Sequence, residues 1–402
     1  MDPFCISSSV LGSDRHIIVS DDGYNTTLKV PKDMWVFNGA LDPLKPLCLD
    51  SLLKLKGIEI SIKPESKWTR LIEHFIFDSA IVPWSQVMPA IAYKSFVKNL
   101  IKSIVDSIDE LPKDYYKSVW GPIGQFLVGL KAANIDSVGY RSSAAILDRD
   151  SGAFETFRPG QGGYLQPVIY DRFATRTGRL VVSSGPNILT LKREHRKLLK
   201  SSFQSGKICS LDFGALEARI ILLEAGVTPS INDLYAEIAT NLFDKKVDRD
   251  TVKIAVISEL YGSSKRAIGL RLGLAGKMLE DFIELIQSYF KTANLRKRLK
   301  EEFIQTGKIR NRFGRPLDLD DPQDHLFINT YTQSTGVDVS LLGFKKIADD
   351  LGLDGIRPLF VLHDALILDV RSDRIKDVEN YMTVSIPTYE HQFPLKFEMI
   401  SE

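Results

Sequence analysis

The stretch SLDFGALEARIILLEA, residues 210–225, decides the fold of this chain. Residues 207–211 form a short and largely apolar run between Gly206 and a helix-like segment. This pattern predicts a β-strand with Asp212 exposed at its carboxyl end. A carboxylate in that place can hold a divalent metal ion, although a lone Asp at a strand end more often forms a turn or caps a helix. Other segments must therefore decide the role of Asp212.

A second carboxylate lies far downstream, in PLFVLHDALILDV, residues 358–370. Two apolar runs flank the polar pair His363-Asp364, which predicts a β-hairpin with this pair at its tip. We expect the tip to bring Asp364 against Asp212. Two carboxylates that meet in this way could hold two Mg²⁺ ions about 4 Å apart. Phosphoryl transfer from a nucleoside triphosphate needs such a pair of ions. An isolated His-Asp pair is usually only a turn, so its meaning depends on the first motif.

A third segment, residues 249–262, lies between the two acidic motifs. Arg249, Lys253, Ile257 and Tyr261 recur at every fourth position, which places them on one broad face of a helix. Two cations and an aromatic ring on one face suit a triphosphate and a base. A solvated basic helix face is the usual meaning of Arg and Lys at this spacing. The pattern R-x3-K-x7-YG between two acidic motifs is much more specific.

These segments resemble motifs A, B and C of the family A DNA polymerases, which include DNA polymerase I, in the order of that family. The resemblance runs from about Tyr164 to the C-terminus. It depends on several further matches in the family's order: Thr177-Gly178-Arg179-Leu180 with Pro186-Asn187, Tyr289-Phe290, Gly307-Lys308-Ile309, Phe313-Gly314-Arg315, and Asn329 with Gln333 and Asp338.

The resemblance implies a role for each matching residue. Asp212 and Asp364 would bind two Mg²⁺ ions, for which Mn²⁺ can substitute, and Lys253 would serve as a proton donor to the leaving group. Glu217 would exclude the 2′-hydroxyl of a ribonucleotide. The residues implied to bind the deoxynucleoside triphosphate are Arg249, Lys253, Ile257, Tyr261 and Glu217. Those implied to bind DNA are Arg179, Asn329, Gln333, His363 and Gly262.

Two positions depart from the family's pattern. Ala365 follows the His-Asp pair where the family usually has a glutamate, which leaves two protein carboxylates for the metal site. Ile257 stands where the family has Phe or Tyr, next to the sugar of the incoming nucleotide. We expect the second change to affect the discrimination against dideoxynucleotides.

The expected fold class is α+β, a right-hand polymerase with an antiparallel-sheet palm, helical fingers and a helical thumb. Short strand-like segments at residues 17–19 and 58–62 predict strands in a small N-terminal module, and residues 67–108 have a helical pattern. No Asp-x-Glu motif is found before the expected thumb, so we expect no proofreading exonuclease. The expected subdomains are the N-terminal module at 1–65, the thumb at 66–154, the palm at 155–230 and 306–402, and the fingers at 231–305.

The composition limits the other possibilities. The 402 residues are 44% hydrophobic, enough to bury a large core, and the three cysteines (Cys5, Cys48 and Cys209) indicate neither a disulfide framework nor a zinc cluster. The chain has no run of eighteen apolar residues and no signal-peptide pattern at Met1. We expect a cytoplasmic protein of bacteria or of phage-infected cells, with no membrane partner. Its expected partners are primer-template DNA, deoxynucleoside triphosphates and replication accessory proteins.

Two other functions remain open. Single-subunit phage RNA polymerases share the palm and similar motifs, but they have a small residue where this chain has Glu217. A non-catalytic nucleic-acid-binding subunit with the same fold is the second alternative. Such a subunit should have lost its metal aspartates or its triphosphate cations, and this chain retains both sets. Template-directed DNA synthesis is therefore the favoured prediction.

Overall fold

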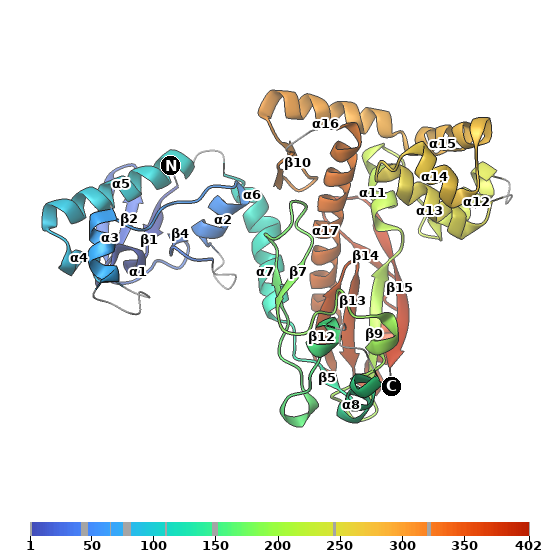
Figure 1. Ribbon diagram of the computed structural model, residues 1–402, viewed down its shortest axis with the longest axis horizontal. Coiled ribbons are helices and arrows are strands. Elements are labelled where there is room, and N and C mark those ends of the chain that lie inside the picture. The colour runs from blue at the N-terminus through green and yellow to red at the C-terminus, as the bar shows by residue number, and fades with distance from the viewer. Residues whose placement is uncertain are drawn as a thin grey trace. The chain divides into compact units, whose positions relative to one another are not determined.

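The computed structural model describes residues 2–41, 47–64, 66–74, 82–108, 111–146, 152–243, 247–319 and 323–401. By its internal contacts the chain separates into two compact units, Met1–Gln125 and Phe126–Glu402 (Figure 1). Parts of the expected thumb, at 75–81, 109–110 and 147–151, lie outside the described residues. The subdomain boundaries stay predictions.

The first unit contains a four-stranded sheet in the order β3-β2-β1-β4, in which β1 pairs antiparallel with β2 and parallel with β4. The strand expected at 17–19 is confirmed within β2. The one expected at 58–62 is wrong: among the described residues, these make no ladder pairs, and Ile62 packs beside Gly39 instead. The strands are β1 (Phe4–Ile6), β2 (His16–Ser20), β3 (Gly23–Thr27) and β4 (Trp35–Phe37).

Helices make up most of the rest of the first unit. The helical pattern expected from 67 to 108 is confirmed where the chain is described, and α5 buries Phe96, Leu100 and Ile104 at helical spacing. The helices are α1 (Ser8–Leu11), α2 (Leu49–Leu55), α3 (Ser66–Glu73), α4 (Trp84–Val87), α5 (Ala90–Ile108), α6 (Lys113–Tyr115), the π-helical turn Tyr116–Trp120, and α7 (Gly121–Val128), which spans the division between the units.

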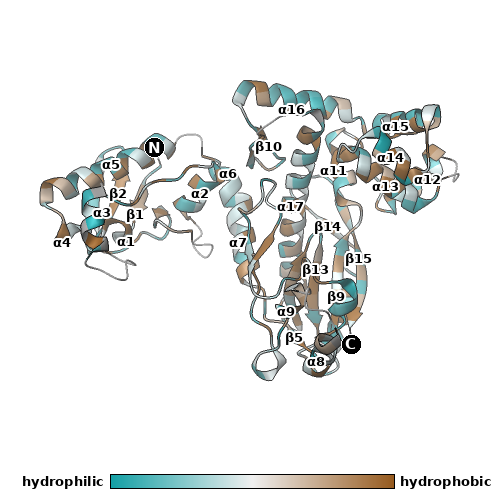
Figure 2. Cartoon of the chain, in the orientation of Figure 1, coloured by the Kyte–Doolittle hydropathy of each residue, from teal (hydrophilic) through white to brown (hydrophobic). Residues whose placement is uncertain are grey.

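A five-stranded antiparallel sheet in the order β12-β13-β9-β15-β14 forms the centre of the second unit. All but the first residue of β13 are buried, and Figure 2 colours this strand brown. Its strands are β9 (Lys207–Phe213), β12 (Ile356–Leu362), β13 (Ala365–Val370), β14 (Thr383–Ser385) and β15 (Gln392–Ser401). Short two-stranded ladders join β5 (Asn134–Ile135) to β8 (Leu199–Lys200), β6 (Ile169–Asp171) to β7 (Val181–Ser184), and β10 (Ile309–Arg310) to β11 (Pro316–Leu317).

The long helix α17 (Asp324–Leu351) packs on this sheet and extends beyond it to α16 (Figure 1). The ring of Phe344 on α17 lies 5.5 Å from that of Phe213 on β9. A Cβ added at Gly343 would lie 2.7 Å from the Phe213 ring, so a glycine is required for this close approach. The helix therefore fixes the end of β9.

The remaining helices of the second unit include a group that shares one core with α17, in which Phe243 stacks on Phe282 at 4.6 Å. The α+β class with an antiparallel sheet is confirmed. None of the described helices is both long and apolar enough to cross a bilayer. The helices are α8 (Ser137–Ile146), α9 (Gly152–Glu155), α10 (Arg193–Arg196), α11 (Leu216–Glu224), α12 (Leu234–Phe243), α13 (Arg249–Leu260), α14 (Lys265–Leu272), α15 (Gly276–Phe290), α16 (Thr292–Thr306) and α18 (Ile375–Glu379).

Candidate functional site

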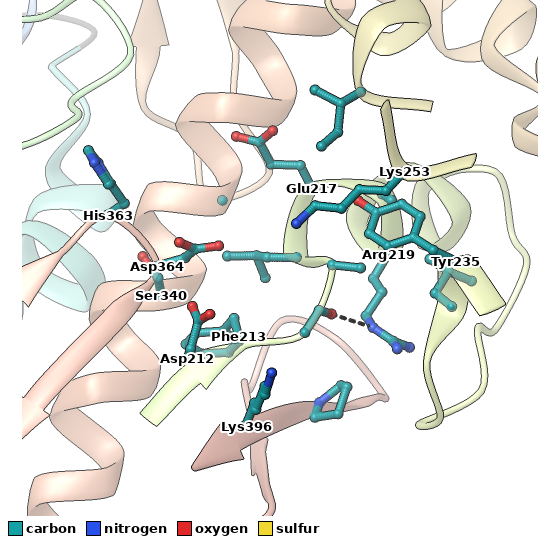
Figure 3. Close-up of a pocket in the computed structure, with 18 of the residues that line it drawn as sticks. Asp212, Phe213, Glu217, Arg219, Tyr235, Lys253, Ser340, His363, Asp364 and Lys396 are labelled. Atoms are coloured by element: carbon teal, nitrogen blue, oxygen red, sulfur yellow. Dashed lines mark hydrogen bonds between the residues drawn. The ribbon is translucent and has the colours of Figure 1, made fainter. Parts of the chain in front are cut away.

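A cavity of about 650 Å³ lies in the second unit, where the ends of β9 and β13 meet α11, α13 and α17 (Figure 3). Most of the residues predicted for the site line it. They are Asp212, Asp364, Lys253, Arg249, Ile257, Tyr261, Glu217, Arg179, Gln333 and His363. The structure therefore brings the three sequence motifs together around one space.

Asp212 is the last residue but one of β9, which ends at Phe213 rather than at residue 211 as expected. It pairs across the sheet with Ala365 on one side and with Lys396 on the other. Neighbouring strands on both sides explain why Asp212 is half-buried, whereas the sequence predicted an exposed side chain. The paired strands fix the side of the sheet to which its carboxylate points.

The expected hairpin with His363 and Asp364 at its tip is confirmed, because these two residues form the whole loop between β12 and β13. His363 has a φ of 55°, a conformation that glycine usually supplies at the first position of such a loop. The backbone N–H of Phe213 donates to the carbonyl oxygen of Asp364 at 3.0 Å. This bond ties the hairpin tip to the end of β9 and brings the two aspartates together.

The carboxylates of Asp212 and Asp364 repel one another in a partly desolvated place. Burial, together with the negative charge of Asp364, raises the pKa of Asp212 to about 7. Burial also raises the pKa of Asp364. Lys253 and Lys396 act in the opposite direction on the pKa of Asp212. Two adjacent carboxylates of this kind are stabilised when a cation joins them.

Glu217, in the first turn of α11, is held from two sides. The hydroxyl of Tyr261 donates to its Oε2, and Nη2 of Arg179 donates to its Oε1 at 3.1 Å. Burial and the charge of Glu217 raise the pKa of Tyr261, so the phenol stays protonated and remains a donor. The carboxylate is thus fixed at the wall of the cavity.

The helix α13 begins at a regular cap, because the Asp248 side chain accepts from the backbone N–H groups of Asp250 and Thr251. Arg249 is paired at the start of the helix: its Nε lies 2.6 Å from Asp233 and its Nη1 lies 2.7 Å from Asp250. One turn further on, Lys253 points into the cavity (Figure 3). The two expected triphosphate cations therefore differ in how readily they can meet an anion.

Two of the predicted DNA-binding residues do not line the cavity. Asn329 lies one turn before Gln333 on α17 and accepts a hydrogen bond from the Nε2 of Gln333. Gly262 ends the turn after α13 with a φ of +70°, and a Cβ there would lie 2.2 Å from that of His325. Gly262 and His325 line a second, smaller cavity. The DNA-binding roles of these residues stay predictions.

Sequence reasoning gave no role to several residues of the site. The buried guanidinium of Arg219 donates to the carbonyl oxygens of Gly214, Ser230 and Asn232, and so fastens the loop before α12 to the end of β9. Arg219 lies in the stretch 210–225, which resembles motif A, and its place there was a usable signal. The other cavity residues that were missed include Asp233, Tyr235, Ser340 and Lys396.

Comparisons with known proteins give matches in sequence and in fold. A family model described as DNA polymerase family A matches residues 168–401, more than half of the chain. The thermostable DNA polymerase I of Thermus filiformis is 25% identical over 260 residues, which cover 57% of this chain and 31% of that protein. DNA polymerase I of Pseudomonas aeruginosa is 23% identical over 242 residues, covering 52% of this chain and 26% of the relative. The matched region thus spans about a third or less of these two curated relatives.

A solved structure shows the fold. The POL domain of Pol1 from M. smegmatis, in complex with a DNA primer-template and dNTP, matches with a TM-score of 0.59 and 14% sequence identity. The match covers 99% of this chain and 94% of that one. The right-hand architecture expected from the sequence is confirmed by this likeness.

Proposed function

Because this chain belongs to DNA polymerase family A, we propose that it adds deoxynucleotides to the 3′ end of a primer under the direction of a template. The observation that carries the proposal is the meeting of Asp212 and Asp364 in one cavity with Lys253 across from them. The partners would be primer-template DNA and deoxynucleoside triphosphates, as in the M. smegmatis complex. Accessory proteins and a cytoplasmic location in bacteria or phage-infected cells belong to the same proposal.

The donor set fits divalent metal ions. Asp212 and Asp364 offer hard carboxylate oxygens, and their raised pKa values reflect burial and mutual repulsion that a bound cation relieves. Ala365 adds no third carboxylate beside them. We assign two Mg²⁺ ions to this pair, with Mn²⁺ as a substitute. When bound, such ions lower the pKa of the primer hydroxyl and neutralise the charge of the leaving pyrophosphate.

The chain's own residues then position the reactants. The 3′ hydroxyl of the primer loses its proton to water, its oxygen forms a bond to the α-phosphorus, the bond to the bridging oxygen breaks, and pyrophosphate leaves on the opposite side. Lys253 would hold the triphosphate and give a proton to the leaving group. Arg249 would contribute by exchanging its contacts with Asp233 and Asp250 for phosphate oxygens.

Selection of the sugar and of the base pair would use separate residues. The carboxylate of Glu217, fixed by Tyr261 and Arg179, would stand where a 2′-hydroxyl must go. Gln333, supported by Asn329, presents an amide that reads acceptors common to every Watson–Crick pair in the minor groove. This arrangement favours DNA synthesis over the RNA polymerase alternative.

Primer extension by the purified protein tests the proposal directly. We expect wild type to extend a DNA primer only when Mg²⁺ or Mn²⁺ is present. Asp212→Asn and Asp364→Asn should each lower single-turnover extension by several orders of magnitude and leave the Kd for DNA within about tenfold. Extension by either variant at the rate of wild type would contradict the site, and no extension by wild type would favour the non-catalytic alternative.

The same preparation tests for proofreading, which we propose to be absent. The support is the sequence before the palm, in which no Asp-x-Glu motif occurs. The protein should leave a mismatched primer at full length in the presence of Mg²⁺ and without nucleotides. Shortening of the primer that persists in Asp364→Asn would contradict this part of the proposal.

A further inference from the structure

Three residues form a row across the sheet at the floor of the cavity. Ala365 on β13 pairs with Asp212 on β9, and Asp212 pairs with Lys396 on β15. Residues directly opposite one another in antiparallel strands project from the same face. Asp212 and Lys396 accordingly both line the cavity, and Figure 3 shows Lys396 on the other side of Asp212 from Asp364.

The cations of the cavity differ in what they already bind. Arg179 pairs with Glu217, Arg249 pairs with Asp233 and Asp250, and Arg219 donates to backbone carbonyls. In the part of the chain that the structure describes, no hydrogen bond or ion pair holds the ammonium group of Lys253 or Lys396. Both side chains are exposed to the cavity solvent. Among the lysines and arginines that line the cavity, these two can therefore meet an anionic ligand without breaking a hydrogen bond or an ion pair.

The direction of the reaction decides which anion Lys396 can meet. In an in-line displacement, the attacking oxygen and the leaving group lie on opposite sides of the phosphorus atom. The hairpin tip is on the β13 side of Asp212 and carries His363, to which the family resemblance gives a DNA-binding role, so we place the primer end there. Lys396 is on the β15 side, separated from the hairpin by β9. We therefore place the leaving pyrophosphate on the β15 side of Asp212, beside Lys396.

We propose that Lys396 binds the terminal phosphates of the incoming nucleotide and of the pyrophosphate product, from the sheet, while Lys253 binds them from α13. The inference rests on the proposed function and adds a phosphate-binding residue to the same site. An ammonium group donates charge-assisted hydrogen bonds to phosphate oxygens. It also places positive charge beside Asp212, whose other neighbour in the row is the uncharged Ala365.

Titration of inorganic pyrophosphate with Mg²⁺ into the full chain tests this inference without catalysis. We expect Lys396→Met to raise the Kd for pyrophosphate roughly tenfold, the loss of a hydrogen bond to a charged group, and Lys396→Arg to stay within about threefold. Lys376→Met is the matched control, because it removes the same charge from the exposed helix α18 outside the cavity. An unchanged Kd in a folded Lys396→Met protein would overturn the inference.

Pyrophosphorolysis and DNA binding separate the alternatives. We expect the KM for pyrophosphate to rise about tenfold in Lys396→Met, with kcat and the Kd for primer-template DNA little changed. A rise in the Kd for DNA with an unchanged KM would instead show that Lys396 contacts the DNA backbone, which overturns the inference. Absence of primer extension by wild type would refute the proposed function, whereas normal pyrophosphate binding by Lys396→Met refutes only this role of the lysine.

Discussion

The hydroxyl of Tyr261 donates a hydrogen bond to the carboxylate of Glu217, which precedes it by 44 residues. The other carboxylate oxygen accepts from Arg179. Glu217 lies on α11 and Tyr261 at the end of α13, so the bond joins the helix after β9 to the one that carries Lys253. A wall of the cavity is thereby fixed by side chains from three separate segments.

Sugar selection should depend on this wall. Glu217→Ala should raise the ratio of ribonucleotide to deoxynucleotide incorporation tenfold or more, because the 2′-hydroxyl then meets empty space. Tyr261→Phe should raise the ratio by a smaller factor, since Arg179 still holds the carboxylate. The two specificity constants are measured by single-nucleotide insertion. Tyr381→Phe is the control, because its hydroxyl donates to Asp350 outside the cavity, and an unchanged ratio in Glu217→Ala would count against the role.

Discrimination against dideoxynucleotides should depend on Ile257, which lines the cavity. Isoleucine has no hydroxyl to replace a missing 3′-hydroxyl. Wild type should therefore discriminate against dideoxynucleotides. Ile257→Tyr should reduce the ratio of kcat/KM for a deoxynucleotide to that for its dideoxy analogue roughly tenfold, about 1.4 kcal/mol of transition-state binding.

A control for the Ile257 variant is available on the same helix. Ile254 is 44% exposed and does not line the cavity, so Ile254→Tyr should leave the dideoxy-to-deoxy ratio as in wild type. If Ile257→Tyr folds and extends primers with an unaltered ratio, Ile257 only packs within its helix bundle.

Chelator-treated protein should lose stability as the pH rises. The pKa of Asp212 is raised to about 7 in the folded chain from its usual 3.8, so between these values the folded state binds more protons than the unfolded state. The free energy of unfolding then falls with increasing pH across this window. The free energy of unfolding, measured by denaturant titration from pH 4 to 7, should fall more steeply for wild type than for Asp212→Asn. Parallel curves would contradict the raised pKa.

A buried carboxylate outside the cavity should contribute strongly to stability. The Glu224 side chain is 1% exposed, accepts from Arg298 at 2.8 Å and accepts from the Tyr389 hydroxyl at 3.1 Å. Glu224→Ala should lower the free energy of unfolding by about 2 kcal/mol or more, because both donors lose their acceptor. Asp349→Ala, which breaks the exposed pair with Lys345, should cost about 1 kcal/mol or less. Equal losses of unfolding free energy in Glu224→Ala and Asp349→Ala, measured by urea denaturation, would contradict this prediction.

The sequence predicted the parts of the site that depend on local patterns. The apolar run before Asp212, the hairpin around His363 and the spacing from Arg249 to Tyr261 each specify one element, and those elements are present. Their order along the chain matched one family, which supplied the three-dimensional arrangement that the patterns alone do not contain.

The missed features depend on contacts between distant segments. Asp233 pairs with Arg249 because the start of α12 folds back on α13, and no local pattern marks that contact. Lys396 lies at the cavity only because β15 pairs with β9 in one particular register. The segment 58–62 had a suitable alternation of residues but pairs with no strand among the described residues. Register and pairing are properties of the whole fold.

The register of the central sheet also bears on how such a protein can change in evolution. Its irregularities, between Pro358 and Phe360 and between Met399 and Ser401, lie at the level of Ser210 to Ile208 on β9, not beside Asp212. A residue gained or lost there leaves the pairing of Asp212 with Ala365 and Lys396 unchanged. One residue inserted beside Asp212 would turn its carboxylate to the opposite face, since side chains alternate along a strand. Homologous chains should therefore vary in length at these irregularities and keep a constant length at the end of the sheet that carries Asp212.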